Sequence, residues 1–256
     1  MTPAEFRRLV AREEFDKPTA GQCNGYVQAN LVVLPRKYAS DFERFCRANP
    51  KPCPLLEMVG PGTTMTSKLA PGADLTNTLP RYRVWIDGQN QNEITDIKDF
   101  YFPDLVFFLL GCSFSFEEAL IEAGIRLRHV DEGKNVSMYR TTLPLVGVGP
   151  FQGEMVVSMR PIHRSKVAQA CIITGRYPEV HGEPVHIGYP EMIGISDLAR
   201  PDYGDPVSIA EDEIPVFWAC GVTPQNVLVK ARLPFAITHA LGYMFVSDLK
   251  NADYAV

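Results

Sequence analysis

The sequence predicts a protein of the α/β class. Segments of strand length, rich in branched and aromatic residues, alternate with short segments whose apolar residues repeat at helical spacing. The chain has 256 residues, 46% of them hydrophobic and 21% charged, which is enough to bury a full core. No internal repeat or low-complexity tract breaks the alternation. We therefore expect strands and helices to share one core.

The first element expected is a helix. Thr2 and Glu5 have the spacing of a capping box, and Pro3 occupies the first helical position. The later elements are expected in this order: a strand over 26–34, a helix ending before Pro50, a strand over 81–87 with a hairpin turn at Asp87-Gly88, a helix over 116–124, a strand over 155–159, a helix over 164–173, a strand over 215–220, a helix capped by Thr223, and strands over 235–239 and 244–246.

Two stretches bear on the division of the chain. Residues 60–80 are rich in Gly, Pro and Thr, which is typical of a long loop or a junction. Residues 105–111 are apolar without alternation, so the pattern fits a buried strand and a buried helix equally. We expect one chain, 1–256, with a smaller subdomain over roughly 60–125 packed on the main α/β domain.

Composition excludes several classes of function. The net charge of -5 and the lack of a basic run disfavour nucleic acid as a partner. The longest apolar run is far too short for a membrane span, which takes about 20 residues. The start of the chain shows no secretory signal. Six scattered cysteines without a Cys-x-x-Cys pair favour reduced thiols, and hence a cytoplasmic protein.

The turn that begins at Gly111 is the first candidate for a site. Cys112 and Ser113 follow an apolar run, and Ser115 has capping-box spacing to Glu118. The start of a helix offers free N–H groups that suit a substrate carboxylate. From spacing alone an ordinary helix cap is the better interpretation, and a packed thiol is the commoner role for Cys112.

Basic residues at turns form a second candidate set. Arg140, Arg160 and Arg176 each lie beside small or polar residues. An arginine at a strand end can hold a carboxylate through two parallel hydrogen bonds. For each arginine taken singly, a structural ion pair is the alternative and the better interpretation.

Histidines and a second cysteine form the third set. His181, His186 and His239 could carry protons near neutral pH, because histidine does this most often. Cys220 precedes a helix start at Thr223, where a thiolate would have a lowered pKa; a buried core cysteine is an equal alternative. No metal-binding motif, nucleotide loop or nucleophile elbow is present, so we expect neither a metal nor an organic cofactor.

Eight ordered motifs cover nearly the whole chain: the segments 26–31, 49–57, 81–85, 111–117, 135–141, 156–161, 181–186 and 215–225. Together they resemble a hydro-lyase family of D-glutamate cyclase-like proteins. The resemblance implies a layered α/β sandwich with a smaller α+β subdomain. It also implies conversion of D-glutamate to 5-oxo-D-proline and water without an organic cofactor.

Such a reaction needs a base, an acid, donors for an oxyanion and a clamp for the second carboxylate. The resemblance places these roles among the candidates above. His181, His186, His239 and Cys220 are the predicted catalytic residues. The predicted substrate-binding residues are Asn30, Cys112, Ser113, Ser115, Arg140, Ser158, Arg160, Arg176, Tyr189, Thr223 and Tyr243.

The chain departs from the family pattern at four positions. Thr76, Thr78, Tyr189 and Tyr243 replace ionisable residues, so we expect them to share one pocket with a changed substrate. The leading interpretation is a lyase or cyclase acting on a small carboxylate-bearing metabolite. The alternatives are an isomerase or ring-forming enzyme of specialised metabolism on a less charged substrate, and a small-molecule binding protein without catalysis. A small homo-oligomer is the expected assembly.

Overall fold

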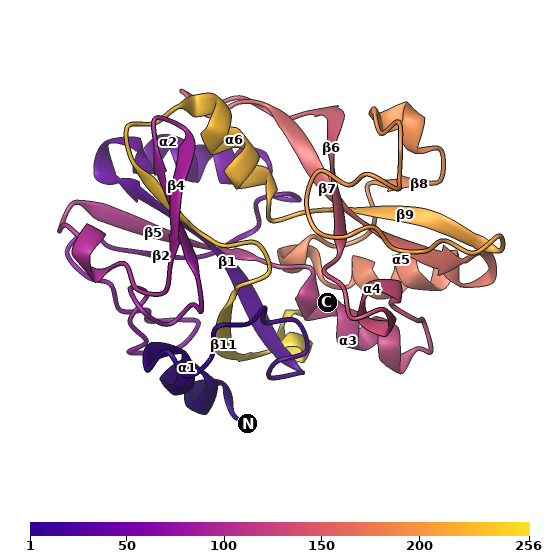
Figure 1. Cartoon of the computed structure of the whole chain (residues 1–256), viewed down its shortest axis with the longest axis horizontal. Helices are drawn as coiled ribbons and strands as arrows, with labels where there is room; N and C mark the ends of the chain where they lie inside the picture. Colours follow the sequence, from indigo (N-terminus) through magenta and orange to yellow (C-terminus); the bar gives the residue numbers. More distant parts are fainter.

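The protein contains two antiparallel β-sheets with helices packed around them, as the computed structural model of residues 1–256 shows (Figure 1). The larger sheet has seven strands, and the order is β2-β5-β1-β10-β3-β4, with β11 also paired to β1. Its strands are β1 (Tyr26–Pro35), β2 (Leu55–Val59), β3 (Tyr82–Ile86), β4 (Gln89–Ile94), β5 (Leu105–Gly111), β10 (Ala236–His239) and β11 (Phe245–Lys250). The α/β class is confirmed.

The smaller sheet has four strands in the order β6-β7-β9-β8. They are β6 (Ser137–Pro144), β7 (Glu154–His163), β8 (His186–Ile187) and β9 (Glu213–Ala219). Residues 60–125, for which a smaller subdomain is predicted, contribute β3, β4 and β5 to the larger sheet. The division of the chain into domains, and the layered sandwich, remain predictions.

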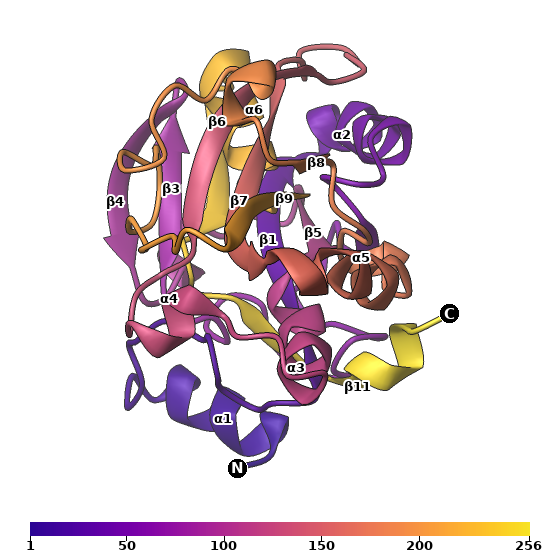
Figure 2. The same ribbon diagram turned by 90° about the vertical axis from the view of Figure 1, so that its right-hand side faces the viewer.

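Six α-helices surround the sheets. They are α1 (Pro3–Ala11), α2 (Arg36–Ala48), α3 (Phe114–Glu122), α4 (Arg128–Asp131), α5 (Val167–Gly175) and α6 (Thr223–Ala231). Short 3-10 turns are η1 (Lys98–Phe100), η2 (Arg164–Lys166), η3 (Pro178–Val180), η4 (Pro190–Ile193) and η5 (Asn251–Tyr254). In Figure 2, α3 and α5 lie side by side, apart from α2 and α6. None of these helices combines the length and apolar character needed to cross a bilayer.

Strand β5 shows why its sequence lacks alternation. All seven of its residues are buried, because side chains from both of its faces enter hydrophobic clusters. Leu105, Phe107 and Leu109 belong to one cluster, while the intervening Val106 and Phe108 belong to the other. A central strand covered on both faces has no polar positions, so strand and helix could not be separated by pattern.

One core joins the two sheets. Leu31 of β1, Phe107 of β5 and Trp218 of β9 belong to the same cluster of 27 buried residues, which also includes Phe116 of α3. The sheets are therefore packed together around α3. This packing brings the end of β5, the start of α3 and the middle of β7 to one place.

Three local signals are found where the sequence predicts them. The predicted capping box of Thr2 and Glu5 is confirmed, since Glu5 N–H binds Thr2 Oγ1 at 3.3 Å and Thr2 N–H binds Glu5 Oε2 at 2.8 Å. In α2, Phe42 and Phe45 form the buried face, as their spacing predicts. Asp87 adopts a positive φ of 50° at the hairpin turn between β3 and β4, also as predicted.

Candidate functional site

Arg160 lies at the centre of a buried polar cluster between the two sheets. It extends from β7, its side chain has no solvent exposure, and its guanidinium lies between two aromatic rings. The guanidinium carbon is 5.3 Å from the ring centre of Phe116 and 5.4 Å from that of Trp218. A guanidinium in such a position needs polar partners, because burying an unpaired charge is costly.

Glu117 of α3 is the main partner of this guanidinium. Its Oε1 accepts hydrogen bonds from Arg160 Nε at 3.0 Å and from Nη2 at 2.5 Å, and His129 Nε2 lies 3.2 Å away. Burial alone would raise the pKa of Glu117, but Arg160 and His129 together lower this pKa to about 2. Glu117 is therefore an ionised carboxylate at neutral pH.

Two serine hydroxyls complete the shell around Arg160. Ser158 Oγ accepts from Nη1 at 3.0 Å, and Ser113 Oγ accepts from Nη2 at 3.1 Å. Because each hydroxyl oxygen receives a guanidinium proton, its own proton remains free to donate. Ser113 and Glu117 bind the same guanidinium nitrogen, so Arg160 holds a hydroxyl donor and a carboxylate acceptor close together.

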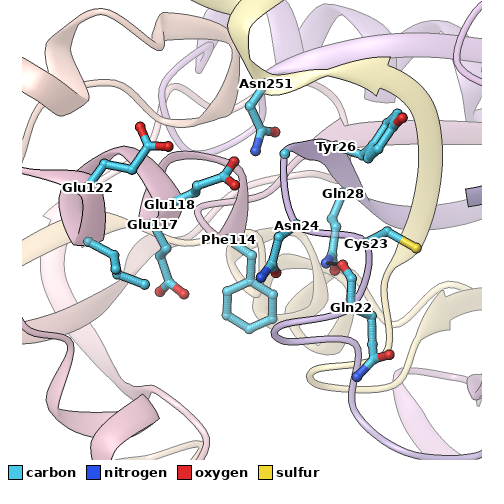
Figure 3. A pocket seen from close by; sticks show the side chains of 12 residues that line it. Gln22, Cys23, Asn24, Tyr26, Gln28, Phe114, Glu117, Glu118, Glu122 and Asn251 are labelled. Atoms are coloured by element: carbon cyan, nitrogen blue, oxygen red, sulfur yellow. Dashed lines mark hydrogen bonds between the residues drawn. The ribbon is translucent and has the colours of Figure 1, made fainter. Parts of the chain in front are cut away.

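A pocket of about 260 Å³ borders Glu117. Its walls are α3, the loop 22–25, the start of β1 and the first residue of η5, and Figure 3 shows the side chains of Phe114, Glu117, Asn24 and Gln28 around the same opening. Gln28 is anchored, since its Nε2 donates to the carbonyl of Thr19 at 2.9 Å. The buried cluster thus has one member, Glu117, at the wall of an open pocket.

Close packing fixes the turn that leads into α3. Asn30 Nδ2 donates to the carbonyl of Gly111 at 2.6 Å, which ties the end of β5 to β1. A β-carbon on Gly221 would lie 2.1 Å from Asn30 Nδ2, and one on Gly111 would lie 2.1 Å from the carbonyl oxygen of Glu179. A larger residue at Gly111 would meet backbone, and one at Gly221 would require the Asn30 side chain to move.

Cys112 and Cys220 are buried near Arg160, at the ends of β5 and β9. Burial raises the pKa of Cys112 to about 12 and that of Cys220 to about 11. Both side chains are therefore protonated thiols at neutral pH. Of the two alternatives for Cys220, the buried core cysteine is the one found, because desolvation exceeds the effect of the nearby helix start and raises the pKa of the thiol.

Two of the predicted proton carriers are buried and neutral. His181 Nδ1 lies 2.8 Å from the carbonyl oxygen of Lys51, and its Nε2 has no partner. His239 Nδ1 accepts from the backbone N–H of Leu31 at 3.1 Å, within the larger sheet. Burial lowers the pKa of each histidine to about 4, so neither is charged at neutral pH.

Four other predicted site residues lie outside the buried cluster around Arg160. Tyr189 is 70% exposed at the edge of the smaller sheet, where its carbonyl lies 3.0 Å from His186 Nε2. Arg140 is exposed, and its guanidinium binds the Tyr203 hydroxyl at 2.9 Å. Arg176 Nε donates to the carbonyl of the last residue at 3.2 Å. Of the three arginines, only Arg160 belongs to the buried cluster.

The helix starts differ from the prediction. Ser115 does not cap α3: the helix begins at Phe114, and Ser115 Oγ accepts the backbone N–H of Gln28 at 3.1 Å. Thr223 is the first residue of α6 rather than its cap, and its hydroxyl binds the backbone of Val156. Both hydroxyls join neighbouring strands to helices, because tertiary contacts outweigh the local capping pattern.

The four positions that depart from the family pattern do not form one pocket. The hydroxyls of Thr76 and Thr78 bind within their own loop. The ring of Tyr243 lies 5.8 Å from the guanidinium carbon of Arg81, while Tyr189 projects from the smaller sheet. The expectation that all four share a single pocket is wrong, because Tyr189 is exposed beside the smaller sheet while the hydroxyls of Thr76 and Thr78 bind within the loop that precedes β3.

The reading of the sequence missed Glu117 and His129 as members of the site. Glu117 is the last residue of the motif 111–117. It lies one helical turn after Ser113, directly after the apolar Phe116 and one turn before the apolar Leu120. A carboxylate at that position of a buried helix face was an available signal, because buried acids are paired or functional. Nothing local indicated His129.

Comparison with known proteins places this site in a family. The family model described as D-glutamate cyclase matches residues 106–248, which include Ser113, Glu117 and Arg160. A relative from Geobacillus kaustophilus named "Putative hydro-lyase GK2103" is 53% identical over all of this chain and 97% of its own length. A "Putative hydro-lyase" from Rhodopseudomonas palustris is 55% identical over all of this chain and 94% of its own. One from Rubrobacter xylanophilus is 54% identical over 99% of this chain and 98% of its own.

Among solved structures, a nitrogen repressor-like protein from Methanococcus jannaschii aligns over 95% of this chain and 97% of its own, with 10% identity and a TM-score of 0.39. The sequence matches define the class as the hydro-lyases, enzymes that break carbon–oxygen bonds in small molecules. The chain belongs to the D-glutamate cyclase family.

Proposed function

We propose that this enzyme removes water from a small metabolite that carries both an amine and a carboxyl group, with D-glutamate as the first candidate. In that reaction the amine nitrogen forms a bond to the side-chain carboxyl carbon, and one carbon–oxygen bond breaks. The ammonium gives up its two surplus protons as the amide forms, and the departing oxygen leaves as water. The product is 5-oxo-D-proline.

The observation that carries the proposal is the position of Glu117. Its carboxylate lies at the pocket wall, and Arg160 holds one of its oxygens from inside the protein. A substrate ammonium beside Glu117 would find an ionised acceptor for its proton. The pKa of about 2 makes this carboxylate a weak base, so its role in the proposal is to accept a hydrogen bond from the ammonium and to orient the amine, with His129 Nε2 3.2 Å from its Oε1.

Ser113 is the proposed donor to the reacting carboxyl group. Its oxygen accepts from Arg160, which leaves its proton for an oxygen that gains negative charge as the new bond forms. The protonated thiols of Cys112 and Cys220 lie near the same guanidinium and remain candidates for the acid that assists loss of hydroxide. Asn30 and Ser158 act on this site by holding the turn and the guanidinium.

A second candidate is a hydro-lyase of the same site acting on a less acidic substrate. The observation that favours it is the pocket itself, whose lining includes three glutamates and no lysine, arginine or histidine. A dicarboxylate would find no cation there. Arg160 cannot fill this role without releasing a partner, since its contacts are already Glu117, Ser113 and Ser158.

The test is a proton NMR time course with D-glutamate, L-glutamate and 5-oxoproline. We expect enzyme-dependent interconversion of one glutamate enantiomer with 5-oxoproline, and a loss of at least about a hundredfold in rate for Glu117→Gln. Glu191→Gln removes the same charge from an exposed side chain of η4 and is the matched control. Folded enzyme without turnover on these compounds would reject D-glutamate and direct the search to less acidic substrates.

A further inference from the structure

A second polar cluster lies where β7 ends and β9 begins. His163, the last residue of β7, is paired with Glu213, the first residue of β9, and the backbone N–H of Arg164 donates to the carbonyl of Asp212 at 2.9 Å. This pairing brings the side chains of His163 and Asp212 together beside the short turn η2. A pocket of about 350 Å³ opens there, and it shares no lining residue with the pocket beside Glu117. The reaction proposed above uses none of its residues.

Ser165, His163 and Asp212 form a continuous chain of polar contacts at this pocket. His163 Nδ1 lies 2.7 Å from Ser165 Oγ and accepts the backbone N–H of Ser165 at 3.3 Å. Because a backbone N–H can only donate, Nδ1 is the unprotonated nitrogen of the neutral ring, and Nε2 carries the proton. Nε2 in turn lies 3.2 Å from Asp212 Oδ2. The hydroxyl therefore has a base beside it, and a carboxylate fixes the tautomer of that base.

The cap of η2 does not account for the whole arrangement. A capped turn needs only the bond from the backbone N–H to Nδ1 of His163, and the Asp212 carboxylate takes no part in it. Ser165, His163 and Asp212 are all exposed and all line the pocket, so a solute can reach the hydroxyl. The order of hydroxyl, imidazole and carboxylate is the one that activates a serine as a nucleophile on several unrelated folds.

The charges of the pocket indicate which compounds fit it. The two arginines that line it each lie against a carboxylate, so their charges are offset. Lys166, next to Ser165 in the chain, donates instead to the neutral side-chain oxygen of Gln169 at 3.0 Å. No side chain caps α5, which begins directly after Lys166, and the start of a helix stabilises negative charge. An ester with a carboxylate of its own would find a nucleophile and a cation side by side here.

We propose that Ser165, His163 and Asp212 form a second catalytic site, which hydrolyses small esters that carry a carboxylate. Ser165 Oγ bonds to the ester carbonyl carbon while its proton passes to His163 Nδ1, and the carbon–oxygen bond to the alcohol breaks as that proton moves on to the alcohol. Water then bonds to the acyl carbon, the acid departs, and a proton returns through His163 to Ser165. Asp212 stabilises the imidazolium that forms between the transfers, the first N–H groups of α5 donate to the carbonyl oxygen, and Lys166 holds the carboxylate of the substrate.

The test follows the coloured nitrophenolate that two esters release. The nitrophenyl monoester of adipic acid carries a carboxylate, and nitrophenyl hexanoate has the same acyl chain length without one. We expect the enzyme to hydrolyse the adipate ester with the higher kcat/KM, and Ser165→Ala to lower this value at least about a hundredfold. The control, Ser196→Ala, changes an exposed serine outside the pocket and should leave the value unchanged. A rate in Ser165→Ala equal to that of the enzyme would overturn the site.

Covalent labelling locates the nucleophile without a variant. Diisopropyl fluorophosphate forms a bond from phosphorus to an activated serine oxygen as fluoride leaves. We expect peptide mass spectrometry of the labelled enzyme to find the adduct on Ser165, and His163→Gln to slow the labelling at least about a hundredfold because the base is lost. Adducts on other serines alone would overturn the assignment.

Two further comparisons test the substrate class and the location. Lys166→Gln should raise the KM for the adipate ester about threefold relative to its effect on the hexanoate ester, because a half-exposed charge pair is weak. Equal effects on both esters would reject the preference for a carboxylate. Ester hydrolysis that is lost in Glu117→Gln but kept in Ser165→Ala would belong to the pocket beside Glu117 and reject the second site.

Discussion

Replacing Arg160 by methionine should destabilise the fold strongly. The guanidinium is fully buried, and four hydrogen bonds join it to Glu117, Ser113 and Ser158. Methionine fills much of the space between the rings of Phe116 and Trp218 but leaves the Glu117 carboxylate without its main partner. Breaking a buried pair from one side costs about 3–5 kcal/mol, so we expect the free energy of unfolding to fall by that amount.

The assay is urea unfolding of four proteins at pH 7: the enzyme, Arg160→Met, Glu117→Gln and the double variant. The double variant should be less destabilised than the sum of the single variants by about 1–3 kcal/mol, because Glu117→Gln removes the charge that Arg160→Met leaves unpaired. Additive single effects would show that Arg160 and Glu117 do not depend on each other. A loss below about 1 kcal/mol for Arg160→Met would refute the account of a buried pair.

The same pair predicts a dependence on pH. The folded pKa of Glu117 is about 2, below the ordinary value of 4.5, so ionised Glu117 contributes about 3 kcal/mol of stability at pH 7. Because the folded value is the lower one, this contribution is present above about pH 4.5 and is lost as the pH falls toward 2. The pH dependence of stability below pH 5 should therefore be weaker in Glu117→Gln. Equal slopes in both proteins would contradict the lowered pKa.

Three further predictions concern the surroundings of the site. Gly221→Ala should lower the unfolding free energy by about 1–3 kcal/mol, because its β-carbon would lie 2.1 Å from Asn30 Nδ2; an unchanged Tm would show that Asn30 moves aside freely. Cys112 and Cys220, whose pKa values burial raises to about 12 and 11, should resist iodoacetamide at pH 8 until the chain is unfolded, as peptide mass spectrometry can check. Burial lowers the pKa of His239 to about 4, so stability should fall by about 3 kcal/mol as the pH drops from 6.5 to 4, and His239→Gln should flatten that slope; a slope retained in the variant would argue against it.

The sequence predicted most of the strands and helices, because their signals are local. The capping box at Thr2 and the hairpin turn at Asp87 each depend on residues within four positions of one another. The run over β5 was recognised as buried, yet its type was left open, since both faces of the strand are covered. Strand β4 was not predicted, because its polar residues show no apolar alternation.

The candidate site followed from the sequence only in part. Arg140, Arg160 and Arg176 have similar local settings, and the pattern could not tell which of them is buried. Glu117 and Arg160 are separated by 43 positions, so no spacing rule links them. Both residues lie in motifs of the family, but the motifs do not show that the two side chains are in contact.

The sequence by itself determined the α/β class, the family and the set of polar residues from which a site could be built. Tertiary structure alone decided which of those residues meet, because β7 and α3 come together only when the two sheets share one core. It also decided protonation, since burial and a neighbouring charge set the pKa of Glu117, Cys220 and His239. Contacts between distant segments set both properties, and local sequence carries little information about them.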